Sequence, residues 1–77
     1  MVSICGKQLM FQKTKVGYWP VVMDASVSER IPLILDESDI DIAVEMVQRI
    51  PESDHPFSYV RMMVAGAISI GMKYRGS

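Results

Sequence analysis

The sequence predicts an α+β domain in which short N-terminal β-strands, a hairpin plus an edge strand, pack on a C-terminal pair of helices. Three observations predict this class. Residues 1–35 hold short apolar runs, one of them with a period of two, broken by glycine and proline. Apolar residues then recur at helical spacing up to residue 50, behind a cluster of acids. Residues 57–72 are apolar almost throughout. We therefore expect residues 1–35 to be mostly β and residues 36–75 to be mostly α.

A chain of 77 residues has room for one domain, residues 1–77. A domain this small is marginally stable unless a disulfide, a metal or oligomerisation helps it. Cys5 is the only cysteine, so an intrachain disulfide and a thiolate zinc site are both excluded. Oligomerisation is then the remaining source of stability. A second reading, that the chain is a fragment of a larger protein, stays open, as does the reading of Gly76-Ser77 as a cloning remnant.

The first third of the chain contains the expected strands. Two short apolar runs, residues 2–5 and 8–13, predict a hairpin. The next segment, residues 18–23, contains Pro20, which has no N–H to give to a neighbouring strand. We therefore expect this segment at a sheet edge or as an extended arm. An edge that exposes Trp19 offers another chain a place to pair.

Two short segments precede the helices. Residues 24–30 are expected to form a turn or a single helical turn, because Ser26 and Glu29 have the spacing of a capping box. The apolar run at residues 31–35 is too short for a helix, so we expect it to be extended.

The first predicted helix covers residues 38–50. Ser38 is the expected N-cap, with Asp41 in the capping-box position. Its apolar face at helical spacing consists of Ile40, Ala43, Val44, Val47 and Ile50. Ile42 and Met46 lie beside that face and widen the apolar arc to roughly 200°, about twice what a helix on the outside of a monomer needs. We therefore expect this helix to be covered on two sides.

The second predicted helix covers residues 54–72. Ser53 or Asp54 is the expected cap, and Pro56 suits the first turn because its missing N–H is not needed there. The helix is apolar nearly all round, which is typical of a helix at the centre of a packing arrangement. Residues 68–75 also alternate between apolar and polar, so a helix and a strand are both open there.

Methionine and glycine content indicates a packing surface. The chain has seven methionines, a residue that fills core gaps and also lines adaptable binding surfaces. Gly66 and Gly71 each cost about 1 kcal/mol relative to alanine inside a helix, which is tolerable where a neighbouring backbone approaches closely. The candidate partner or oligomer interface consists of Trp19, Ile42, Met46, Met62, Met63 and Gly66.

Charge is segregated along the chain. Residues 1–23 hold three lysines and no acid, residues 24–54 hold nine acids and two arginines, and residues 55–77 hold three basic residues and no acid. Folding could place the acidic block beside the basic ends. Alternatively, the blocks form complementary surfaces for a neighbouring copy or partner, which would steer association.

The sequence holds no pattern that predicts a catalytic residue, a metal ligand or a cofactor. His55 is the only histidine, and no local signature pairs it with Cys5 as base and nucleophile. The longest uncharged stretch in the C-terminal half, residues 62–72, is well below the roughly 20 residues of a membrane span. No secretory signal is evident at the start of the chain, so we expect a cytoplasmic or intracellular protein.

These features favour a non-enzymatic protein–protein interaction or self-assembly module, whose partner is itself or a larger protein. A small structural or assembly protein of viral or phage type, and a regulatory adaptor, both fit that description. The alternative is a small nucleic-acid-binding regulator that uses the basic and aromatic N-terminal region: Lys7, Lys13, Lys15 and Tyr18. The acidic middle of the chain would repel phosphate, which makes nucleic acid the less favoured partner.

Overall fold

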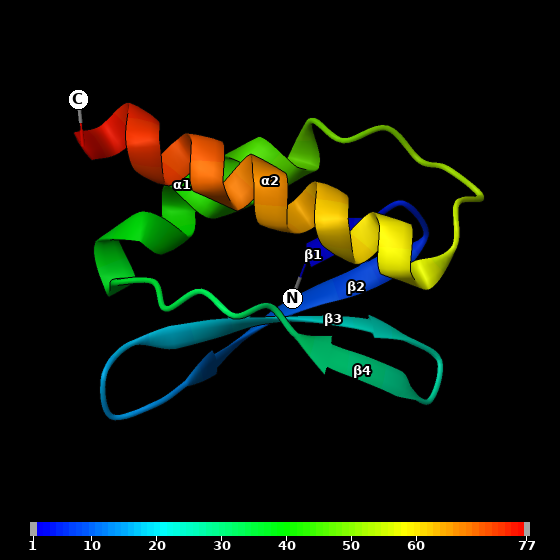
Figure 1. Cartoon of the computed structure of the whole chain (residues 1–77), viewed down its shortest axis with the longest axis horizontal. Coiled ribbons are helices and arrows are strands. Elements are labelled where there is room, and N and C mark those ends of the chain that lie inside the picture. The colour runs from blue at the N-terminus through cyan, green and yellow to red at the C-terminus, as the bar shows by residue number, and fades with distance from the viewer. Residues whose placement is uncertain (1, 77) are drawn as a thin grey trace.

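A computed structural model describes residues 2–76 as a four-stranded antiparallel sheet followed by two helices. Both helices lie on one face of the sheet, which leaves the other face open (Figure 1). The expected α+β class is therefore confirmed. The question of a cloning remnant at Gly76-Ser77 falls on Ser77, which lies outside the described residues.

The four strands follow one another in sequence order across the sheet. They are β1 (Val2–Ile4), β2 (Lys7–Lys13), β3 (Tyr18–Asp24) and β4 (Val27–Arg30). The predicted N-terminal hairpin is confirmed as β1–β2. Its two-residue turn, Cys5-Gly6, has positive φ at both positions, 49° and 76°, as the tight turns that match strand twist require.

The prediction that Pro20 marks an edge strand is wrong, because β3 lies between β2 and β4. The carbonyl of Pro20 accepts a hydrogen bond from the Ile31 N–H at 2.8 Å, so the backbone polar groups of Pro20 face the β4 side. There β4 has already ended at Arg30. The Phe11–Pro20 pair in the β2–β3 ladder is consequently one of the pairs that exchange no hydrogen bonds. The β2–β3 ladder therefore loses no hydrogen bond at the proline.

Of the two alternatives predicted for residues 24–30, a turn is present and the helical turn is wrong. Ala25 and Ser26 form the turn between β3 and β4, with Ala25 at a positive φ of 55°. Glu29 pairs with Val22 across the sheet and caps no helix. The run at residues 31–35 forms no helix, but a tight turn interrupts it, in which the Leu33 N–H donates to the Ile31 carbonyl at 2.7 Å. Only Leu35 pairs with a strand, at Tyr18.

Helix α1 (Glu37–Gln48) begins earlier than predicted. Its N-cap is Asp36, with Asp39 in the capping-box position, and the pair Ser38 and Asp41 lies inside the first turns. The reason is tertiary. Both backbone polar groups of Leu35 bond to Tyr18, at 2.8 and 2.9 Å, which holds the chain extended up to the residue before the cap.

Helix α2 (Phe57–Gly76) is continuous, so residues 68–75 are helical. The prediction of Ser53 or Asp54 as its cap is wrong. The Pro56 carbonyl accepts the first bonds, from the N–H groups of Tyr59 and Val60 at 3.0 and 3.1 Å. The Ser53 hydroxyl accepts a bond from the His55 N–H within the preceding loop.

The core lies between the covered face of the sheet and the two helices. The sheet contributes Leu9 and Val22, which are directly opposite each other, and α1 contributes Ala43 and Val47. From α2 a single stripe is buried, made of Val60, Val64, Ile68 and Gly71. Among residues 2–76, no helix is both long and apolar enough to cross a membrane.

Candidate interaction surface on the second helix

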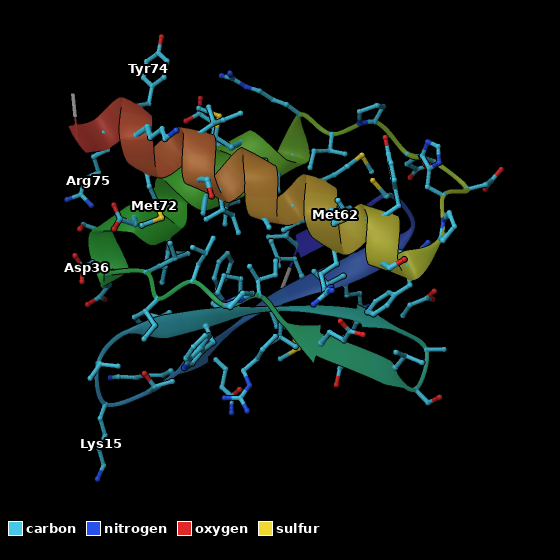
Figure 2. All side chains as sticks on the ribbon, viewed as in Figure 1. Lys15, Asp36, Met62, Met72, Tyr74 and Arg75 are labelled. Atoms are coloured by element: carbon cyan, nitrogen blue, oxygen red, sulfur yellow. The ribbon has the colours of Figure 1, made fainter. Side chains whose placement is uncertain are left out.

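The side of α2 that faces away from the core carries a line of exposed residues. Met62 is 68% exposed, Ile70 57% and Tyr74 76%, and Tyr59 is 46% exposed at the start of the line. We call this line the outer stripe: Tyr59, Met62, Gly66, Ile70 and Tyr74. Its members are three or four residues apart, which places them on one face of the helix. Tyr74 points away from the sheet in Figure 2.

The two helical glycines of α2 have different surroundings. A Cβ at Gly71 would lie 2.9 Å from Cγ2 of Ile42 and 3.2 Å from Cγ of Met46, so this glycine allows α1 and α2 to pack closely. A Cβ at Gly66 would meet nothing within 4 Å. Glycine costs about 1 kcal/mol in a helix. The fold accounts for that cost at Gly71 but not at Gly66, in the middle of the outer stripe.

Met62 and Gly66 are the two members of the predicted interface that fall on the outer stripe. Ile42 and Met46 are half-buried against Gly71, so α2 itself covers the second flank of α1. That flank also borders a groove of about 360 Å³ between the helices, next to Tyr74.

The remaining predicted interface residues lie apart from the stripe. Met63 is half-buried against the core. Trp19 lies on the open face of the sheet, where the Arg30 guanidinium sits 5.5 Å from its ring centroid. The structure therefore divides the six predicted residues between several surfaces.

Sequence reasoning missed three members of the stripe, Tyr59, Ile70 and Tyr74. Their spacing from Met62 was visible in the sequence, but nearly every sector of this helix is apolar, so spacing alone could not separate the outer face from the buried one. The exposed fractions separate them.

A small apolar groove adjoins the outer stripe at Met62. It encloses about 190 Å³ and is lined by Ile31, Pro32, Arg61, Met62 and Ala65. An ion pair between Arg61 and Glu29, at 2.8 Å, fixes the one charged side chain in its lining. The groove therefore extends the apolar surface from α2 toward the sheet.

Some charges of the acidic and basic blocks pair with each other inside the folded chain. Glu29 pairs with Arg61, and Asp39 pairs with Arg75, so both pairs join the acidic middle to the basic C-terminal block. These pairs support the intrachain interpretation of the charge blocks. Exposed charges persist at the two ends of α2: Glu52 and Asp54 in the loop before it, and Lys73 in its last turn.

The residues of the nucleic-acid alternative are not brought together. Lys7 and Lys13 lie at opposite ends of β2, about 20 Å apart along the strand. Lys15 projects from the β2–β3 loop, away from the helices (Figure 2). Tyr18 is half-buried beside Leu35, and its neighbour Trp19 points to the opposite face because side chains alternate along a strand. No continuous basic and aromatic platform results.

Cys5 and His55 have separate surroundings. The Cys5 thiol is buried and donates to the Pro51 carbonyl at 3.2 Å, and burial raises its pKa, with Glu52 adding to the rise and Lys7 opposing it. The His55 ring lies 4.3 Å from the ring of Tyr59. In the part of the chain that the structure describes, no group of three or more His, Cys, Asp or Glu is placed to hold a metal ion.

Comparisons with protein-family models, with curated proteins and with solved structures found no match.

Proposed function

We propose that this domain is a non-enzymatic protein–protein interaction module that contacts its partner through the outer stripe of α2. The partner is another copy of the chain or a larger protein. The observation that supports this is the exposure of Met62, Ile70 and Tyr74, at 68, 57 and 76%, on one face of a 20-residue helix. Large apolar side chains gathered in this way are typical of binding surfaces.

The size of the stripe suits that role. Its four large residues are between 46% and 76% exposed, so each offers on the order of 100 Å² of surface. The stripe is therefore an apolar patch of about 400 Å², comparable with the largest patches on small soluble proteins, which are often functional. The groove beside Met62 enlarges it.

Gly66 supports the same proposal independently. Within the described chain nothing packs close to its Cβ position, so no contact of the fold compensates for the helical stability that this glycine costs. A partner helix that approaches the stripe at this point would make use of the missing side chain. The single buried thiol of Cys5 suits an intracellular, reducing compartment for such a module.

Site-specific photo-cross-linking tests the proposal. A photoreactive amino acid replaces Met62 in one variant and Ser28 in a matched control, expressed in the organism that carries the gene. Ser28 is exposed in β4 on the open face of the sheet, and its replacement leaves α2 unchanged. We expect a discrete adduct from position 62 but not from position 28.

The substitution Ile70→Glu should abolish the adduct formed at position 62, because Ile70 lies two helical turns along the same stripe and its side chain is 57% exposed. If position 62 gives no adduct beyond that of position 28, or if Ile70→Glu leaves the adduct unchanged, the outer stripe is not a binding surface.

A further inference from the structure

Resting on the proposed function, we infer that the outer stripe binds a second copy of this chain, with the two α2 helices antiparallel and crossing at Gly66. A two-fold interface of this kind places the same surface of each copy against the other. The stripe meets that requirement because its residues are arranged almost evenly on both sides of Gly66.

The crossing point defines which residues meet. With the two-fold axis at Gly66, positions equally far before and after it face each other. Met62 and Ile70 are each four residues from Gly66, so Met62 of one copy meets Ile70 of the second copy. Tyr59 meets Lys73 of the second copy, an arrangement that suits a cation over an aromatic ring. The open space at Gly66 lets the two backbones approach.

Charge at the ends of α2 favours the antiparallel orientation. Glu52 and Asp54 are exposed just before the helix, and Lys73 is exposed in its last turn. An antiparallel pair brings each acidic loop near the basic end of the second copy. A parallel pair would bring acid to acid and base to base. Charges arranged in this way fix orientation and register more than they add affinity.

The area available indicates a weak dimer. Four side chains of roughly 100 Å² on each copy give about 800 Å² in total. The flanks of the stripe and the groove beside Met62 bring the interface to the order of 1,000 Å², the lower limit for a specific contact. We therefore expect a reversible, concentration-dependent association and not a permanent dimer.

Disulfide trapping with the purified full chain tests the geometry. Each variant carries Cys5→Ser, which removes the native thiol and keeps a donor for the Pro51 carbonyl. Met62→Cys and a size-tagged Ile70→Cys are mixed in equal amounts and oxidised gently. Disulfides require Cα atoms within about 7 Å, so they report direct neighbours.

If the copies paired in random orientation, the mixed 62–70 product would equal the sum of the two self-linked products. We expect the mixed product to exceed that sum. Gly66→Cys alone should link to itself, and the control Ser28→Cys should stay monomeric. Self-linked 62–62 and 70–70 products in excess would overturn the antiparallel geometry. Circular dichroism of each variant establishes that it is folded.

Light scattering across a concentration series separates this inference from the proposed function. We expect the mass to rise toward that of a dimer, and the rise to disappear in Ile70→Glu. A monomer at every concentration, with no trapped product, overturns the second copy as partner. If the photoreactive residue at position 62 then still captures a different protein through the stripe, the proposed function stands alone; if it captures nothing, both fail.

Discussion

The contrast between Gly71 and Gly66 allows a quantitative prediction about how the two helices pack. The perturbation is the same at both sites, Gly71→Ala and Gly66→Ala. At position 71 the added methyl would lie 2.9 Å from Cγ2 of Ile42 and 3.2 Å from Cγ of Met46. At position 66 it would enter open space. The two variants therefore share a gain in helix propensity and differ in packing.

The magnitude follows from those two effects. Alanine stabilises a helix interior by about 1 kcal/mol relative to glycine, so Gly66→Ala should raise the free energy of unfolding by up to that amount. At position 71 the Met46 side chain can move, but the branched Ile42 side chain is confined to one rotamer in a helix. Overpacking of this kind costs about 1–3 kcal/mol. We therefore expect the free energy of unfolding of Gly71→Ala to be about 1–3 kcal/mol lower than that of Gly66→Ala.

Urea unfolding followed by far-ultraviolet circular dichroism measures both variants, at a protein concentration low enough that the midpoint does not depend on it. A third variant, Ile42→Ala combined with Gly71→Ala, removes the methyl that the new Cβ meets. The Ile42→Ala change should therefore cost less in the Gly71→Ala background than in the wild type. Equal stability of Gly66→Ala and Gly71→Ala, with additive effects of Ile42→Ala, would refute the close α1–α2 contact.

Three other outcomes are expected. Asp36→Ala should lower the free energy of unfolding by about 0.5–1 kcal/mol, while Ser38→Ala changes it little, because Asp36 is the N-cap. Urea unfolding midpoints of the two variants measure this, and a larger loss in Ser38→Ala would identify Ser38 as the cap. Burial raises the pKa of Cys5 above its ordinary value of 9.0, so the folded state holds this proton more tightly. The associated stability is complete below that pH and is lost as the pH rises through the folded pKa. Urea midpoints on either side of pH 9.0 should therefore fall more in the wild type than in Cys5→Ser, and equal falls would contradict the buried thiol. Single-stranded oligonucleotides should show no salt-dependent binding in a fluorescence titration, since the N-terminal lysines are dispersed; binding that weakens with salt would revive that alternative.

Local patterns predicted the elements that local physics controls. The hairpin at β1–β2 and the existence of both helices follow from short-range periodicity and turn residues. The place of Pro20 in an interior strand does not, because it depends on β4 ending at Arg30 on the side that the proline faces. The choice of cap also lies beyond local sequence. Asp36 and Ser38 each have an acid three residues later, and the long-range bonds between Leu35 and Tyr18 decide between them.

The same limit applies to the candidate site. Met62 and Gly66 were selected from the sequence because the chain is rich in methionine and because a helical glycine is tolerable where a neighbouring backbone approaches closely. The same reasoning also selected Met63, which is half-buried against the core. Ile42 and Met46 were selected because they widen the apolar arc of α1, but both side chains pack against Gly71 of the same chain. A sequence shows that a helix needs a second cover, whereas only the packing shows whether the chain supplies it.

The open face of the sheet is the alternative surface for a partner. One pair of substitutions can test whether the partner binds there or at the outer stripe of α2. Met10 and Val21 lie directly opposite each other there, beside Trp19. Trp19 and Val21 are half-buried, with the Arg30 guanidinium 5.5 Å from the Trp19 ring centroid, and Met10 is 37% exposed compared with 68% for Met62. None of these three open-face side chains therefore matches the exposed fraction of Met62 on the outer stripe.

Met10→Lys places a charge at the centre of the open sheet face, and Ile70→Lys places the same charge on the outer stripe. Sedimentation equilibrium should show that Ile70→Lys weakens self-association by about tenfold or more, since a lysine would lose hydration without gaining a partner. Met10→Lys should leave the dissociation constant unchanged. The opposite result would move the interface to the sheet. Because both variants add one positive charge at an exposed position, a change in net charge cannot account for a difference between them.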